Sequence, residues 1–325
     1  MSARVLLLPA LILAVAALFV ISLAIGPAPV PLSALWGGSD ELARIVMQEI
    51  RLPRALLALL VGGSLGLSGA ALQGFLRNPL AEPGVVGISG MAGLGAVIAL
   101  YGGLSTGFAL ALPMLAIGGA LLTVLLLQVL AGSSSTVTLV LAGVAISSLS
   151  GALMSLALNL SGNPFAVTEI VFWLLGSLAD RSMLHVTLAA PFILLGAALL
   201  LLGARPLDAL ALGEEAALGM GIDLARLRWL VVLGTALCVG AGVAVSGVIG
   251  FVGLVVPHVL RPLVGHRPSA LLPVSALGGA VLLLAADIAV RLLSPESELR
   301  LGVLTAMIGA PFFFWLVIAR RKAEG

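Results

Sequence analysis

Residues 55–76 form an uncharged run that sharply limits what this chain can fold into. The run is about 22 residues long, and an α-helix of that length spans about 33 Å, enough to cross a hydrocarbon core of about 30 Å. Small residues recur at every fourth position within it, at Gly62, Gly66 and Ala70. Such spacing lets a second helix approach closely in lipid. We therefore predict a membrane-spanning helix that packs tightly against a neighbour.

The composition extends this prediction to the whole chain. Of the 325 residues, 61% are hydrophobic and 9% are charged, whereas a soluble domain carries roughly 25% charged residues. Aromatic residues make up 5% and there are 40 glycines, which favours packed helices over a β-barrel with aromatic girdles. The net charge of +2 gives no argument for nucleic acid. We expect an all-α integral membrane protein with one domain over residues 1–325.

About ten apolar stretches are predicted to cross the membrane. The first could be a signal peptide, but its apolar core is longer than is usual for one, so we expect a retained span. Residues 26–54 are predicted to form a long loop, and the stretch FWLLGSL at 172–178 a short or re-entrant helix. Residues 251–265 are predicted as a short or tilted span. The predicted spans are residues 5–25, 55–76, 85–101, 108–130, 139–160, 186–203, 229–250, 251–265, 271–293 and 301–319.

The basic residues predict an orientation. An even number of spans puts both termini on one side, and Arg4 together with residues 320–322 favours the cytoplasmic side. The longest polar segment, residues 204–228, then also lies in the cytoplasm. It is predicted to form two short helices broken at Gly219 and Gly221. Such a helix pair can insert into a groove on a partner protein or can be a plain solvated connector.

Six arginines fall on the predicted outer side, against the positive-inside rule, and they are Arg44, Arg51, Arg54, Arg181, Arg291 and Arg300. Three of them, Arg51, Arg54 and Arg291, lie at the outer mouths of predicted spans. A guanidinium binds a carboxylate through two parallel hydrogen bonds, so these residues could dock an acidic soluble partner. The alternative is that they reach toward lipid phosphates.

Several absences limit the chemistry. The single lysine, Lys322, rules out a G-x-x-x-x-G-K-[ST] phosphate loop, so any nucleotide site belongs to another chain. His185, His258 and His266 lack metal-ligand spacing, and we expect no metal site. No Ser-His-Asp or paired-carboxylate arrangement supports an enzyme. The lone cysteine, Cys238, forms no internal disulfide.

Asp287 is the one acid deep inside a predicted span. Intramembrane acids are costly and are functional hypotheses by default. No basic residue lies within a neighbouring predicted span, so a proton relay has no support. A direct transport role and a helix–helix hydrogen bond remain open for Asp287.

A series of motifs resembles, in order and spacing, the FecCD-type permeases of ABC importers. The resemblance covers nearly the whole chain and implies a BtuC-like, type II ABC importer permease with about ten transmembrane helices. It implies a homodimer in the bacterial inner membrane that moves its cargo by alternating access along the dimer interface. The motifs are RLPR, SGAALQG, RNPLAEPG, LVLAGVA, FWLLGSL, GFVGLVVPH, LLLAADI and ESELRLGVLTAMIGAPFFFWL.

The resemblance also implies partners and site residues. A periplasmic substrate-binding protein would dock on Arg51, Arg54 and Arg291. Two cytoplasmic ATPase subunits would use ATP and magnesium, and this chain would bind no cofactor. The segment at about 206–226 would couple to the ATPase. The predicted coupling residues are Leu212, Gly213, Glu214, Glu215, Ala216, Leu218, Gly219, Met220 and Gly221.

A cytoplasmic gate is implied at two turns, which pattern alone would also allow to be plain connectors. One contains Asn78 and Leu80, and the other Thr136 and Val137. Val137 stands where the family has a small polar residue, so that gate would be apolar here.

The cargo is the least determined feature. The FWLLGSLADRS segment is most similar to haem-type members, which favours haem, with ferric siderophores and vitamin B12 as alternatives. An ion-coupled secondary transporter is a rival of another class, but it would need charged residues in several spans. A membrane assembly protein without transport activity is a second rival, and it would not stimulate a partner ATPase.

Overall fold

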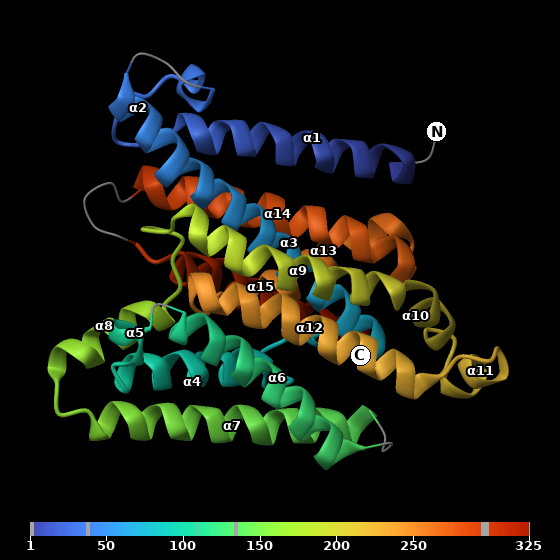
Figure 1. The fold of residues 1–325 in the computed structure, drawn as a ribbon. Helices are drawn as coiled ribbons and strands as arrows, with labels where there is room; N and C mark the ends of the chain where they lie inside the picture. Colours follow the sequence, from blue (N-terminus) through green and yellow to red (C-terminus); the bar gives the residue numbers. More distant parts are fainter. Residues whose placement is uncertain (1–2, 37–39, 109, 133–135, 294–298, 325) are drawn as a thin grey trace.

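The computed structural model describes residues 3–36, 40–108, 110–132, 136–293 and 299–324, and within these the chain is helical without strands. Figure 1 shows long helices lying side by side in one bundle. Arg51, Arg54 and Arg291 lie on elements that meet at one end of this bundle, which we call the arginine end. The polar segment 203–223 projects from the opposite end, which we call the loop end.

Seven helices in the described residues are long and apolar enough to cross a membrane. Three further apolar helices are shorter, so the predicted all-α membrane fold is confirmed. The long helices are α1 (Ala3–Ala24), the continuous helix Glu41–Phe75 that contains α3 (Leu52–Phe75), α6 (Ala111–Ala131), α7 (Thr136–Leu160), α9 (Met183–Leu202), α12 (Leu224–Ser246) and α14 (Pro268–Leu293). The shorter ones are α4 (Ile88–Tyr101), α8 (Pro164–Leu174) and the apolar part Leu301–Leu316 of α15 (Leu301–Glu324). Helix α5 (Leu104–Gly107) is a single turn.

Helices α3 and α12 form the centre of the bundle. In their apolar stretches 78% and 83% of the residues are buried, compared with 11% in α1 at the periphery. A Cβ atom added to Gly62 would overlap the carbonyl oxygen of Gly279, and one added to Gly66 would overlap that of Ser275. Helix α14 therefore approaches α3 to backbone contact at these glycines, as their spacing predicted.

The predicted loop 26–54 is wrong in its second half. Asp40 caps a helix by accepting a hydrogen bond from the Ala43 amide at 3.1 Å. The helix then runs through α2 (Glu41–Ile45) and a π-helical stretch, η2 (Val46–Arg51), directly into α3, beside the short helix η1 (Leu32–Leu35). Polar side chains here indicated the end of the membrane crossing, but they do not end the helix.

Two further expectations are corrected by the lengths of the helices. Helix α13 (Val252–Leu260) has nine residues and is about 14 Å long, which is too short to cross a membrane. It is followed by η3 (Pro262–Val264), and a turn with left-handed residues at Gly247 and Phe251 separates it from α12. The short helix expected at 172–178 is α8, which starts earlier because Asn163 caps it and ends at Leu174.

The polar segment forms two short helices, as predicted, but the break lies elsewhere. Helices α10 (Ala204–Leu210) and α11 (Glu214–Gly219) are separated at Gly213, whose φ is +116°. Gly221, with φ of +77°, lies in the turn between α11 and α12. Gly219 is the last residue of α11 and Gly221 follows it, so neither predicted break point divides α10 from α11.

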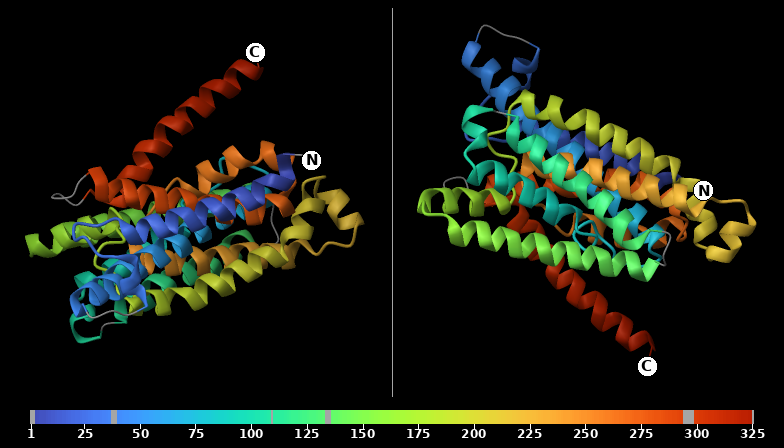
Figure 2. Two further views of the ribbon diagram at one scale, coloured as in Figure 1. Left: turned by 90° about the horizontal axis from the view of Figure 1, so that it is seen from above. Right: turned by 60° about the horizontal axis from the view of Figure 1, so that its bottom comes forward.

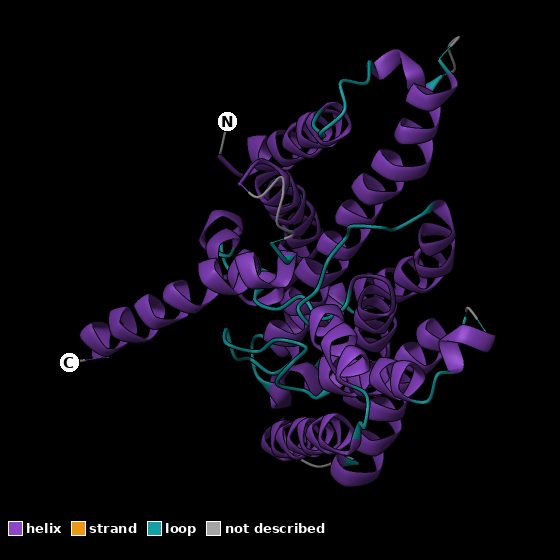
Figure 3. Ribbon diagram, turned by 90° about the vertical axis from the view of Figure 1, so that its left-hand side faces the viewer, coloured by secondary structure: helices purple, strands orange, loops and turns teal. Residues whose placement is uncertain are grey.

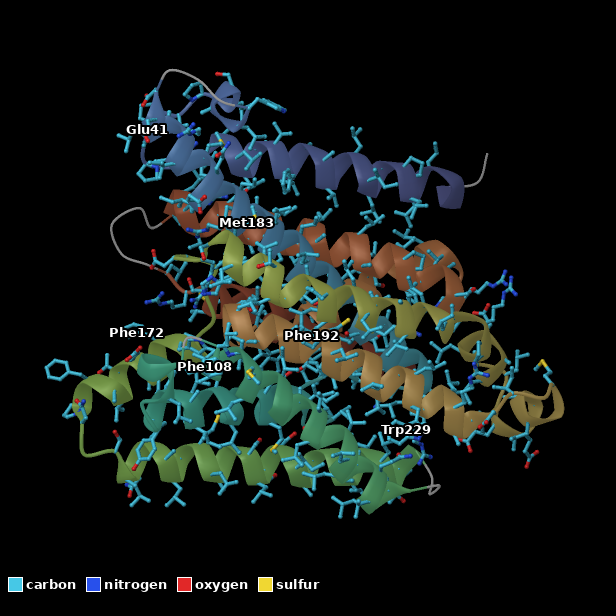
Figure 4. The ribbon with its side chains drawn as sticks, in the orientation of Figure 1. Glu41, Phe108, Phe172, Met183, Phe192 and Trp229 are labelled. Atoms are coloured by element: carbon cyan, nitrogen blue, oxygen red, sulfur yellow. The ribbon has the colours of Figure 1, made fainter. Side chains whose placement is uncertain are left out.

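Helix α15 leaves the bundle. Figures 2 and 3 show it beginning beside the other helices near the arginine end and then projecting away from them. Its large apolar side chains are exposed, among them Met307 and Phe314, at 66% and 69%. Figure 4 places Trp229 near the loop end of α12, a position typical of an aromatic residue at a membrane interface.

Candidate functional site

Asp287 and two arginines form a buried cluster at the arginine end. Arg54 Nε lies 2.9 Å from Asp287 Oδ1 and 3.1 Å from Oδ2. Arg291, one turn further along α14, brings Nη2 to 3.0 Å from Oδ2. The Asp287 side chain is 1% exposed, and a buried carboxylate is tolerated only when it is paired. The sequence did not reveal that Arg54 and Arg291, at the ends of their helices, are the partners of Asp287. Because Asp287 is paired with both, a direct role for it as a free intramembrane acid has no support.

Arg51 fastens the end of α1. Its Nη1 donates hydrogen bonds to the carbonyl oxygens of Leu23 at 2.8 Å and Ala24 at 3.1 Å, and Nη2 donates to the carbonyl of Ala28. The last carbonyls of a helix have no partner within the helix, and a cation there also offsets the negative end of the helix dipole. Arg51 is 4% exposed, so these hydrogen bonds replace the water contacts that its charge would otherwise make.

Arg291 completes this attachment from α14. Its Nη1 lies 2.9 Å from the carbonyl oxygens of both Ser22 and Ile25, and Nη2 lies 2.6 Å from Ser22 Oγ. One side chain thus joins α1 to the Asp287 cluster. The end of α1, the start of α3 and the end of α14 are held together by three arginines.

The three arginines differ in their access to a partner. Arg54 and Arg291 line a cavity of about 470 Å³, which also contains Asp180, whereas Arg51 is not among its lining residues. The structure brings the three predicted docking residues together, and it leaves two of them facing an open space. Their docking role remains a prediction, and Arg51 has a structural role of its own.

The predicted coupling residues surround α11 at the loop end. Leu212, Leu218 and Met220 expose 72%, 57% and 52% of their surface, while Ala217 beneath them is buried. Exposed large apolar side chains on a projecting helix are typical of a surface that contacts another protein. The remaining predicted residues, Gly213, Glu214, Glu215, Ala216, Gly219 and Gly221, belong to α11 and its two flanking turns.

Two polar side chains attach the coupling segment to the bundle, in addition to the buried Leu207 and Leu210 of α10. Asp208 accepts hydrogen bonds from the Ser269 amide at 2.8 Å, from Ser269 Oγ at 2.6 Å and from Arg267 Nε at 2.9 Å. Glu214 forms an ion pair with Arg77, just beyond the end of α3, at 3.0 Å. Burial works to raise the pKa of Asp208, but the hydrogen bonds from Ser269 and Arg267 outweigh it and hold that pKa below its ordinary value.

The first predicted gate turn is well anchored. Asn78 Oδ1 accepts a hydrogen bond from the Leu80 amide at 3.0 Å, so the two predicted residues share one turn. Just before it, Gln73 Nε2 donates to the carbonyl of Gly253 at 3.2 Å and Gln73 Oε1 accepts from Arg261 at 2.7 Å. This turn is therefore tied to α13.

The second predicted gate lies at the start of α7. Val137 is 68% exposed there, and the side chain of Thr136, like residues 133–135, lies outside the described part of the structure. Both predicted gates are at the loop end (Figure 1). Their function as a gate remains a prediction.

Two of the three histidines have ordinary structural contacts. His185 Nδ1 lies 3.1 Å from Ser182 Oγ at the start of α9, and the ring of His258 packs edge-on against Phe312. Among the described residues no group of three His, Cys, Asp or Glu side chains could hold a metal ion. Cys238 is buried in α12.

The seven described helices that are long and apolar enough to cross a membrane define a multi-pass membrane protein, with an arginine-lined cavity at one end and a projecting helix pair at the other. The chain belongs to the FecCD transport family, whose family model matches residues 12–319. As in its relatives, this chain is a transport permease.

Relatives agree over nearly the full length. The chain is 42% identical to the Fe(3+) dicitrate transport system permease protein FecD of Escherichia coli (strain K12), covering 95% of this chain and 97% of that protein. It is 45% identical to the vitamin B12 import system permease protein BtuC of Vibrio cholerae, covering 86% and 84%. A solved structure described as an inward-facing conformation of a metal-chelate type ABC transporter matches with a TM-score of 0.87 at 37% identity, covering 96% and 98%.

Sequence reasoning missed the residues that attach the coupling segment. Asp208 and Ser269 are 61 positions apart, and neither stands in a pattern that indicates a partner. Gln73 and Arg261 are 188 positions apart, and no sequence pattern indicates that they are in contact either. For Arg77 and Glu214 the opposite charges at the predicted cytoplasmic side were the one available signal.

Proposed function

We propose that this chain is the permease of an ATP-driven importer that brings a metal chelate from the periplasm into the cytoplasm. The observation that carries the proposal is the placement of its two candidate surfaces. An arginine-lined cavity suited to acidic side chains lies at one end of the bundle, and the exposed apolar side chains of α11 lie at the other. Membership of the FecCD family supports this assignment.

The two surfaces have separate proposed partners. A periplasmic binding protein docks at the arginine end through carboxylates that reach Arg54 and Arg291. Two ATPase subunits, which bind ATP and magnesium, receive α11 at the loop end. The loop end and both termini lie in the cytoplasm, and the basic residues Arg205, Arg226 and Arg228 of that end support this orientation.

The working unit is a homodimer. Helix α15 supports this proposal because it leaves its own bundle and exposes Met307, Phe314 and Trp315 along its length. A second copy would give this helix a packing partner and enclose a pathway between the two chains. A pathway with large, mostly apolar walls suits a bulky chelate, because a cargo that makes few specific contacts with the walls can be released into the cytoplasm.

Haem is the cargo we propose to test first, with a ferric siderophore and vitamin B12 beside it. The named relatives include a ferric dicitrate permease and vitamin B12 permeases. Liposomes holding this protein with its ATPase would be supplied with binding proteins loaded with each chelate in turn. ATP-dependent uptake of haem alone would support haem as the cargo, and uptake of another chelate would identify that cargo instead.

Two variants test the assigned surfaces. Arg54→Gln should abolish stimulation by the binding protein, while Arg44→Gln, which alters an exposed arginine of the same end, should not. Leu218→Asp should weaken binding of the ATPase, and Leu218→Met should preserve it. Uptake that continues without any ATPase would overturn the proposal in favour of an ion-driven transporter.

A further inference from the structure

Helices α3 and α14 are locked into one body. At Gly62, Gly66 and Gly279 the two backbones touch, and each of these glycines would clash with a carbonyl oxygen of the opposite helix if it carried a Cβ. Close-packed backbones cannot shift against each other without collision, so small displacements are transmitted and not absorbed. A force on one end of this pair moves the other end.

Asp208 holds the coupling segment to the start of this body. Its carboxylate lies on α10 but caps the first turn of α14, where the amide of Ser269 has no partner within its own helix. With Ser269 Oγ and Arg267 it accepts three hydrogen bonds between 2.6 and 2.9 Å. A carboxylate at this position also interacts favourably with the positive end of the α14 dipole. The contact therefore combines three hydrogen bonds with a favourable dipole.

The second attachment is weaker. Glu214 and Arg77 join the coupling segment to the end of α3 at 3.0 Å, but both side chains are 44% exposed. Exposed ion pairs contribute between about 0 and 1 kcal/mol and are screened by salt. By its polar contacts the coupling segment is thus held more firmly to α14 than to α3, while the buried Leu207 of α10 packs beside Gly74 of α3.

We propose that Asp208 is the positioning residue through which movement of the coupling segment is transmitted to the α3–α14 body. The inference rests on the proposed function, in which the ATPase acts on α11. Arg54 lies at the far end of α3, and Asp287 and Arg291 lie at the far end of α14. The body driven through Asp208 is therefore the one that carries the docking arginines, so one rigid unit connects the two proposed partners.

The chain offers a matched control. Asp223, in the turn that follows α11, also caps a helix by accepting a hydrogen bond from the Arg226 amide at 3.0 Å. It caps its own helix, α12, and does not join the segment to α14. Asp208→Ala and Asp223→Ala each remove a capping carboxylate, but Asp208→Ala alone breaks the proposed link.

The test is the number of chelate molecules imported per ATP hydrolysed, measured with the complete transporter in liposomes. We expect Asp208→Ala to lower this ratio about tenfold, within the range typical of coupling between two sites. Binding of the ATPase and basal hydrolysis should be retained. Asp208→Asn should give a ratio between those of the unaltered protein and Asp208→Ala. Ser269→Ala should lower the ratio less than Asp208→Ala does, and Asp223→Ala should leave the ratio unchanged.

An unchanged ratio in Asp208→Ala, or an equal fall in Asp223→Ala, would overturn the inference. If Asp208→Ala fails to fold, Asp208→Asn and Ser269→Ala decide the question, and unchanged ratios in both would overturn it. Absence of ATP-dependent uptake in the unaltered protein would instead refute the proposed function.

Discussion

Arg54 and Asp287 are joined by a hydrogen-bonded ion pair across 233 positions of sequence, with the carboxylate 1% exposed. The pair connects the first turn of α3 to the last turns of α14, and Arg291 completes it from the other side. Two positive charges against one negative charge leave this cluster cationic. It stabilises the fold, and its two arginines line the adjoining cavity together with Asp180.

Replacing Asp287 by alanine should destabilise the protein by about 3–5 kcal/mol, because it leaves two arginines without their buried partner. Thermal unfolding in detergent would measure the change. The control is Glu41→Gln, which removes the exposed Glu41–Arg44 pair and should cost less than about 1 kcal/mol. Equal shifts for the two variants would contradict the assigned role of Asp287.

Arg51→Lys should loosen the end of α1 even though it keeps the charge. An ammonium group cannot reproduce the planar fork that reaches three carbonyls, and we expect a loss of about 2 kcal/mol, since hydrogen bonds to charged groups contribute about 1.5–3 kcal/mol. Hydrogen exchange should quicken at the amides around Leu23 and Ala24. If binding-protein affinity fell while exchange stayed unchanged, Arg51 would be a docking residue instead of a structural one.

Gly66→Ala should destabilise the α3–α14 interface by about 1–3 kcal/mol, because the added methyl group would overlap the Ser275 carbonyl. Gly118→Ala in α6 is the matched control, since nothing lies within 4 Å of its added Cβ. That change should be neutral or stabilising by up to about 1 kcal/mol from helix propensity. The denaturation midpoints of both variants would measure this difference. A shift of both midpoints in the same direction would contradict the close contact between Gly66 and Ser275.

The Asp208 attachment should survive mild acid. A carboxyl whose pKa is lowered on folding contributes stability above its unfolded pKa and loses it as the pH falls through the lowered folded value. The ordinary value is 3.8, so the stability difference between the native protein and Asp208→Asn should stay constant from neutral pH down to about pH 5. It should shrink below pH 3.8. Thermal unfolding of both proteins across this range would check it, and a difference that disappears between pH 7 and pH 5 would contradict it.

The membrane fold could be predicted because crossing hydrocarbon requires long uncharged runs, and such runs are visible in one sequence. Small-residue spacing likewise predicted the close approach at Gly62 and Gly66. The helix from Glu41 to Arg51 could not be predicted in the same way, because its polarity is that of a loop. Helix α13 was overestimated because an apolar run does not reveal where the helix stops, here at Leu260, before η3 and the left-handed residues Gly265 and His266.

The candidate sites were only partly predictable. The three arginines stood out because they oppose a known charge rule, and α11 because it is polar. The partners of Asp287 and Asp208 could not be found, since tertiary packing sets which distant residues meet. The positions of the arginines in the sequence are compatible both with docking a partner and with holding the end of α1. Only the hydrogen bonds of Arg51 in the structure show that this residue holds α1.

The π-helical stretch Val46–Arg51 makes the spacing of this chain as important as its residue types. Its closing hydrogen bond, from Leu52 to Met47, encircles one residue more than an α-helical turn does. Losing one residue there would rotate all preceding positions by about 100° relative to α3. Insertions and deletions between Asp40 and Arg51 should therefore be rejected during evolution more strictly than most substitutions in the same segment.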